Sequence, residues 1–183
     1  MKNNLIIVAA LIAFGVISCK KTPETPKMES SFKPSATIQE LMISIVDPNV
    51  DPIWESIETI STANGVEEKH PKTDAEWVVL KNHAIALREV TNLLVIEGRK
   101  VAASNTSTVA AELTPDEIEK LIATNRPAFV KNAHDLHEAV TQAIVAIDAK
   151  DVAALEAVGG AIDQACEKCH MQFWYPGDKR PTH

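Results

Sequence analysis

The stretch Asp151–Phe173, DVAALEAVGGAIDQACEKCHMQF, decides the fold class of this chain. Its apolar and sulfur-containing residues recur every three or four positions, which is the spacing of one side of an α-helix. Asp151 stands directly before this pattern, and aspartate is a favoured residue at the N-terminal cap of a helix. The pattern therefore predicts a long, capped helix. Its core-facing side comprises Leu155, Val158 or Gly159, Ile162, Cys166, and Cys169 or His170.

The same helix carries the run Cys166-Glu-Lys-Cys169-His170 near the end of the chain. This Cys-x-x-Cys-His spacing is typical of the attachment of a c-type haem. The two thiols of such a motif form thioether bonds to the haem vinyl groups, and the imidazole binds the iron as its proximal ligand. Cys166 and Cys169 are therefore the candidate attachment residues, and His170 is the candidate proximal iron ligand. One covalent haem c, with its iron, is the predicted cofactor.

Two other uses of a Cys-x-x-Cys pair fit this chain less well. A thioredoxin-like pair opens a helix after a strand in a βαβ unit, whereas this pair lies at the end of a helical pattern. A structural zinc site would need two more soft ligands. The chain has three cysteines in all, and the third, Cys19, lies in the N-terminal segment. The motif therefore favours haem.

The N-terminal segment is typical of an exported bacterial lipoprotein. A short basic start precedes the apolar run 5–16, whose length of about a dozen residues suits a signal-peptide core and is too short for a membrane span. The run closes on Val-Ile-Ser-Cys19, which resembles a bacterial lipobox. We expect residues 1–18 to be the signal peptide and Cys19 to carry the lipid. Ordinary cleavage near Ser18 is the alternative, but it would leave an unpaired thiol in an oxidising compartment.

Residues 19–34 are predicted to be a flexible, lipid-anchored tether, because they are rich in Pro, Lys, Ser and Thr and contain almost nothing to bury. Haem is attached outside the cytoplasm in bacteria, so this segment and the haem motif imply the same compartment. We expect a periplasmic protein anchored to a membrane through Cys19. Lys20 stands where an Asp would favour the inner membrane, so the outer membrane is the default.

Residues 35–183 are enough for one domain with one hydrophobic core. The formal net charge of −7 argues against nucleic acid as a partner. Four helical segments and no strands are predicted in this domain.

The first segment, residues 35–62, has Ser35 as its expected N-cap. Asp47-Pro48 and Asp51-Pro52 interrupt its pattern, and the second pair suits a fresh start with Asp as cap and Pro at the first helical position. Asn64-Gly65 ends the segment. Ahead of the interruption, the apolar positions at helical spacing are Ile38, Leu41, Met42, Ile45 and Val46.

Thr73 and Glu76 form a predicted capping box, which starts the second helical segment. This segment ends at Gly98, and the small and polar residues 101–112 predict a loop. The core-facing positions of the second segment are Trp77, Leu80, Ala84, Leu87, Thr91 and Leu94.

The third segment starts at a second predicted capping box, Thr114 and Glu117, with Pro115 at the first helical position. It runs to about Ile147, with an expected kink near Pro127. Together with the C-terminal helix, these segments predict an all-α, antiparallel four-helix bundle with one covalently bound haem near the C-terminus.

A helical bundle with this motif near its C-terminus resembles the cytochrome c-prime superfamily, the class II c-type cytochromes. The resemblance covers roughly residues 35–175, and its most specific part is the motif with Phe173 three residues after His170. It implies an up-down-up-down bundle with the haem between helices and one propionate edge towards solvent. The chain departs from the family at Trp174, where a basic residue is common, and in the broken first helix. Dimerisation therefore does not transfer from the family, and a homodimer stays open.

The resemblance also implies a position for the second axial ligand. Low-spin members of the superfamily use a first-helix methionine, and high-spin members place an apolar residue there. Met42 is the matching position, so we expect it to be the distal iron ligand; the alternative is that it only packs on the Ile38–Ile45 face. His83 is the second candidate for distal ligand, because it lies beside the stripe of the second helix. The alternative is that His83 lies at the edge of the core and forms a hydrogen bond with a backbone carbonyl.

These residues predict a non-enzyme that carries single electrons between redox partner proteins. A His/Met iron changes little in geometry between its two oxidation states, and methionine ligation raises the reduction potential. No catalytic acid–base pair or open substrate pocket is evident in the sequence. The alternative is a five-coordinate haem module that binds a diatomic gas, nitric oxide or carbon monoxide. A haem that serves only as a structural staple has no positive support.

Overall fold

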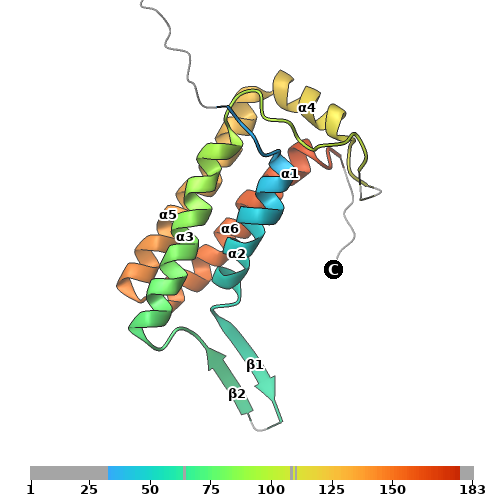
Figure 1. Cartoon of the computed structure of the whole chain (residues 1–183). Coiled ribbons are helices and arrows are strands. Elements are labelled where there is room, and N and C mark those ends of the chain that lie inside the picture. Colours follow the sequence, from blue (N-terminus) through green and yellow to red (C-terminus); the bar gives the residue numbers. More distant parts are fainter. Residues whose placement is uncertain (1–32, 64, 108, 110, 178–183) are drawn as a thin grey trace, which may run out of the picture. The chain divides into compact units, whose positions relative to one another are not determined.

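Helices account for most of the part of the chain that the computed structural model describes, residues 33–63, 65–107, 109 and 111–177 (Figure 1). All of these residues belong to one compact unit. The predicted signal peptide, Cys19 and most of the predicted tether lie outside the described residues. Within the described ranges, no helix has the length and hydrophobicity needed to cross a bilayer.

The first helical segment consists of α1 (Ile38–Leu41), η1 (Met42–Val46) and α2 (Asp47–Trp54), which follow one another without a gap. Its N-cap is Thr37, so the prediction of Ser35 is wrong. Thr37 Oγ1 accepts a hydrogen bond from Glu40 N at 3.1 Å, and Glu40 Oε2 accepts one from Thr37 N at 2.7 Å. This reciprocal capping box satisfies two backbone N–H groups, those of Glu40 and Thr37. A cap at Ser35 would not form these two hydrogen bonds.

The helix is not interrupted at Asp47-Pro48, contrary to the prediction. The turn directly before it, η1, is a π-helix, in which Asp47 N donates to Met42 O. Pro48 has no N–H to continue the ordinary ladder, and its ring crowds the carbonyl one α-helical turn earlier. A π turn is wider by one residue, so it lets the chain stay helical past this proline. Pro52 likewise lies inside α2 and does not begin a new helix.

A β-hairpin follows α2, so the prediction of no strands is wrong. Strand β1 (Glu58–Thr62) pairs antiparallel with β2 (Gly65–Lys69), and Thr62 lies opposite Gly65. All ten strand residues are exposed, so no alternation of buried and exposed side chains marks the strands. The sequence Asn64-Gly65, interpreted above as a helix stop, is also a strong hairpin signal, and the φ of Gly65 is +128°.

The second predicted segment is confirmed as α3 (Asp74–Leu94). Thr73 Oγ1 accepts a hydrogen bond from Glu76 N at 3.3 Å, and Glu76 Oε2 accepts one from Thr73 N at 2.7 Å, so the capping box is present. The helix ends four residues before Gly98, whose φ is +79°. All of the predicted core-facing residues are buried: Trp77, Leu80, Ala84, Leu87, Thr91 and Leu94.

The third predicted segment is two helices, α4 (Pro115–Thr124) and α5 (Arg126–Ala149). The predicted capping box is confirmed, because Glu117 Oε2 accepts a hydrogen bond from Thr114 N at 2.8 Å. Instead of a kink there is a full break at Asn125, which places Pro127 in the first turn of α5. Proline is tolerated there because the first N–H groups of a helix have no partner within it.

The C-terminal helix is α6 (Val152–Phe173), and its predicted cap is confirmed: Asp151 Oδ1 accepts a hydrogen bond from Ala154 N at 2.9 Å. Trp54 of α2 lies against Gly159. Its Nε1 donates to Gly159 O at 3.1 Å, and its Cδ1 lies 3.6 Å from where a Cβ of Gly159 would be. That distance is an ordinary van der Waals contact, so the approach of α2 does not require glycine.

Helix α5 packs against α3 and α6, and α2 packs against α3 and, less extensively, α6. In Figure 1, α1–η1–α2 and α5 run one way along the long helices, and α3 and α6 run the other way. Helix α4 contacts α5 and α6 near the end of α6. The core lies between these helices, where the fully buried side chains include Leu87, Val140, Leu155, Ile162 and Phe173.

Candidate haem site

The Cys-x-x-Cys-His motif occupies the last two turns of α6. Cys166, Cys169 and His170 are half-buried, and both cysteines pack against the hydrophobic core. Phe173, three residues after the histidine, has 0% of its surface exposed. Its ring meets that of Phe129 on α5 edge to face, with the ring centroids 5.4 Å apart. Phe173 therefore anchors the helical turn that carries His170 in the hydrophobic core.

Both cysteines of the motif are free thiols in an apolar environment. Burial is the main cause that raises the pKa of Cys166 to about 12 and that of Cys169 to about 11. A redox-active cysteine reacts as a thiolate, so thiols that stay protonated do not suit that use. A thioether carries no charge, so the same surroundings suit sulfur atoms that are bonded to carbon on both sides.

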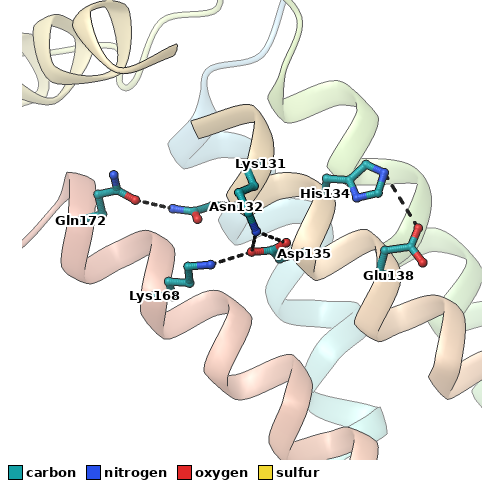
Figure 2. Close-up of polar contacts among 7 residues, drawn as sticks. All are labelled: Lys131, Asn132, His134, Asp135, Glu138, Lys168 and Gln172. Atoms are coloured by element: carbon teal, nitrogen blue, oxygen red, sulfur yellow. Dashed lines mark hydrogen bonds and ion pairs between the residues drawn. The ribbon is translucent and has the colours of Figure 1, made fainter. Parts of the chain in front are cut away.

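Polar contacts tie the motif turn to α5 (Figure 2). Lys168, which lies between the two cysteines, forms an ion pair with Asp135 at 2.7 Å, and Asp135 also binds Lys131 at 2.8 Å. Buried Asn132 donates its Nδ2–H to Gln172 Oε1 at 2.8 Å. These contacts fix the orientation of the motif relative to α5.

Sequence reasoning missed both of these α5 residues. Asn132 is 3% exposed, and a signal for it was available: it is a polar residue one helical turn from Phe129, on an otherwise apolar face. Asp135 gave no such signal, because a charged residue on a helix is most often part of a solvated surface.

A cavity of about 220 Å³ lies beside His170. The imidazole and the indole of Trp174 meet at an angle of 63°, with centroids 5.6 Å apart. Burial lowers the pKa of His170, and the nearby carboxylates of Glu112 and Asp47 act in the opposite direction. The net effect favours the neutral imidazole, which is the form that has a free nitrogen lone pair for a metal ion.

Met42 lines the same cavity as His170. It is half-buried and is the first residue of η1, and π turns occur frequently at functional sites. The structure thus brings the candidate distal ligand and the candidate proximal ligand to one cavity, from opposite ends of the described chain. Met42 also packs against the hydrophobic core, so the alternative that it only packs keeps a structural basis.

The structure does not bring His83 to this cavity. His83 lies on α3, where its Nδ1 is 2.9 Å from Asn49 Oδ1. It lines a different cavity, of about 430 Å³, together with Pro52 and His70. Its hydrogen-bonding partner is a side chain rather than the backbone carbonyl suggested by its position in the sequence.

Two acidic residues at the cavity of His170 were not singled out from the sequence. Burial raises the pKa of Asp47, the charge of Asp51 raises it further, and His170 lowers it. Glu112 accepts a hydrogen bond from the Tyr175 hydroxyl at 2.9 Å. Asp47 belongs to the first helix and Glu112 to the loop before α4, so only the tertiary structure places both of them here.

The described residues hold no group of three or more His, Cys, Asp or Glu side chains placed to bind a metal ion. A haem iron takes only its axial ligands from the protein. Searches of protein-family models, curated proteins and solved structures return no match to this chain. Its own residues therefore carry the functional assignment.

Proposed function

We propose that this chain is a c-type cytochrome of the cytochrome c-prime type, an antiparallel four-helix bundle that carries single electrons. Cys166 and Cys169 would hold one haem through thioether bonds, and His170 would be its proximal ligand. The observation that carries this proposal is that His170, the last residue of the motif, and Met42 of the first helix line the same cavity.

The chain's own residues are suited to this role. The thiols are protonated and lie in apolar surroundings, and such surroundings suit an uncharged thioether sulfur. The lowered pKa of His170 keeps its imidazole neutral and able to donate a lone pair. A bound haem supplies reversible one-electron chemistry at its iron, and a methionine axial ligand raises the reduction potential. We propose a carrier rather than an enzyme, working with redox partner proteins.

The second candidate function rests on the contact between Met42 and the hydrophobic core. If this side chain only packs, the distal side offers no protein ligand. The protein would then bind a diatomic gas, nitric oxide or carbon monoxide, instead of carrying electrons.

The proposed location follows from the N-terminal segment. We propose that Cys19 carries a lipid and that residues 20–34 tether the domain to a bacterial membrane, by default the outer membrane, in the periplasm. The Val-Ile-Ser-Cys19 sequence and the Lys at position 20 support this.

The optical and electron-paramagnetic-resonance spectra of the purified chain, with and without carbon monoxide, test the proposal. We expect haem that stays bound after denaturation, a low-spin signal, and no response to carbon monoxide. The variant Met42→Ala should become high-spin and bind the gas. The matched control is Ile43→Ala, because Ile43 is the next residue of η1 and is 64% exposed; its spectrum should stay low-spin.

The outcomes separate the alternatives. A native chain that is already high-spin and responds to carbon monoxide would favour the gas-binding function. A chain that purifies from a host competent in cytochrome c maturation without covalent haem would refute both functions.

A further inference from the structure

A second cavity, of about 320 Å³, is lined by residues from the end of α3, the start of α5, the start of α1 and helix α4. It is distinct from the cavity of His170, since Val101 alone among the described residues lines both. Its volume is at the lower end of the range of small-molecule sites. Two arginines, Arg99 and Arg126, line it, and both are half-buried.

The two guanidinium groups bind backbone carbonyls. Arg99 donates from Nε to Leu93 O at 2.9 Å and from Nη1 to Ala36 O, and Arg126 donates from Nη2 to Val95 O. These bonds use two of the five N–H donors of Arg99 and one of those of Arg126. Among the described residues, no ion pair joins either guanidinium to a carboxylate.

The carbonyls at the end of α3 explain why arginines lie here, but they do not balance the charge. The C-terminal end of a helix is equivalent to roughly half a negative charge, against two full positive charges. Lys100 and Glu119 also line the cavity and neutralise each other at 2.9 Å. The remaining carboxylate is that of exposed Glu97. The cavity therefore keeps a small positive excess in a chain whose net charge is −7.

The walls of the cavity are apolar. Phe129 is 3% exposed, and the guanidinium of Arg126 lies over its ring at 5.7 Å from the centroid. The lining also includes four buried apolar residues, Ile38, Leu94, Val101 and Ile122. One part of a ligand in this cavity would therefore contact the two arginines, and another part would contact apolar side chains.

We propose that this cavity binds a small organic monocarboxylate. Its carboxylate would accept hydrogen bonds from the free N–H groups of Arg99 and Arg126, whose planar forks match that group. Its short apolar body would lie against Phe129. The small positive excess favours one negative charge over the two of phosphate. This site is independent of the haem proposal, because none of its residues is a candidate haem ligand.

Chemical-shift titration of the isotope-labelled full chain tests the proposal with three probes at constant ionic strength: hexanoate, hexanol and inorganic phosphate. We expect saturable binding of hexanoate with shifts of the Val101, Ile122 and Phe129 amides. Hexanol, which has the same chain length and no charge, should bind about tenfold to a hundredfold more weakly, the range given by the loss of a charge-assisted hydrogen bond. Phosphate should bind more weakly than hexanoate.

Arg126→Gln should weaken hexanoate binding by about the same factor. Arg88→Gln is the matched control, because Arg88 is also half-buried but pairs with Glu89 and does not line the cavity; its hexanoate affinity should stay within about twofold of the native value. If Arg126→Gln unfolds, the affinities of the native chain for hexanoate and hexanol still test the proposal. No saturation, equal affinity for hexanol, an equal loss in Arg88→Gln, or tighter binding of phosphate would each overturn the proposal.

Discussion

Replacing Phe173 by Leu tests whether the aromatic residue after the motif anchors the end of α6. Phe173 is fully buried, and its ring meets Phe129 edge to face at 5.4 Å. Truncation to Ala would cost about 3–5 kcal/mol, a large part of the roughly 5–15 kcal/mol that stabilises a typical domain. Leucine keeps most of the apolar volume but loses the aromatic pair, so we expect a loss of roughly 1–2 kcal/mol.

Urea unfolding followed by circular dichroism measures this loss. Phe129→Leu and the double variant complete a double-mutant cycle, in which we expect a coupling free energy of about 0.5–1.5 kcal/mol. Met171→Ala is the control, because Met171 lies on the same turn and is 49% exposed; its effect should stay within about 0.5 kcal/mol. A coupling near zero, or a Phe173→Leu loss as small as that of the control, would refute the anchoring role.

Three further predictions concern the contacts of α5 and the N-terminus. Asn132→Ala should lower the free energy of unfolding by about 0.5–1.5 kcal/mol, since it removes the hydrogen bond that buried Asn132 donates to Gln172, whereas exposed Gln142→Ala should change it little in the same urea assay. Hydrogen bonds from Lys131 and Lys168 hold the pKa of Asp135 below its usual range. Its contribution to stability is therefore present above the unfolded-state pKa and is lost as the pH falls through the lower folded-state pKa, so the stability difference between the native chain and Asp135→Asn should shrink on acidification; a pH-independent difference would contradict this. Cys19→Ala should move the protein from membranes to the soluble periplasmic fraction, and a variant that stays in the membrane after signal cleavage would exclude lipidation.

The helices that could be predicted are those whose signals are local. The capping boxes at Thr73 and Thr114 and the cap at Asp151 act over three or four residues, so the sequence alone locates those helix starts. The hairpin escaped prediction because its strands are exposed throughout and bury no face of their own. The continuity of the first helix also escaped, because the π turn before Pro48 overrides the usual effect of proline.

The candidate site divides in the same way. The spacing of Cys166, Cys169 and His170 is a property of one helix, so it predicts haem attachment without knowledge of the fold. The resemblance made Met42 a candidate for the other axial position, and helical phase made His83 a second one. Only the packing of the helices places Met42 at the cavity of His170 and pairs His83 with Asn49.

By itself, the sequence of this protein determined the starts of α3, α4 and α6 and the core-facing stripes of α3 and α6, and it predicts the chemistry of the motif. The tertiary structure decided which distant side chains meet: Asn132 with Gln172, and Arg99 and Arg126 at one cavity. The physical reason is the range of the interactions. Caps and helical periodicity depend on hydrogen bonds within one or two turns. Contacts between helices depend instead on packing and crossing geometry, which many sequence positions share and no single stretch encodes.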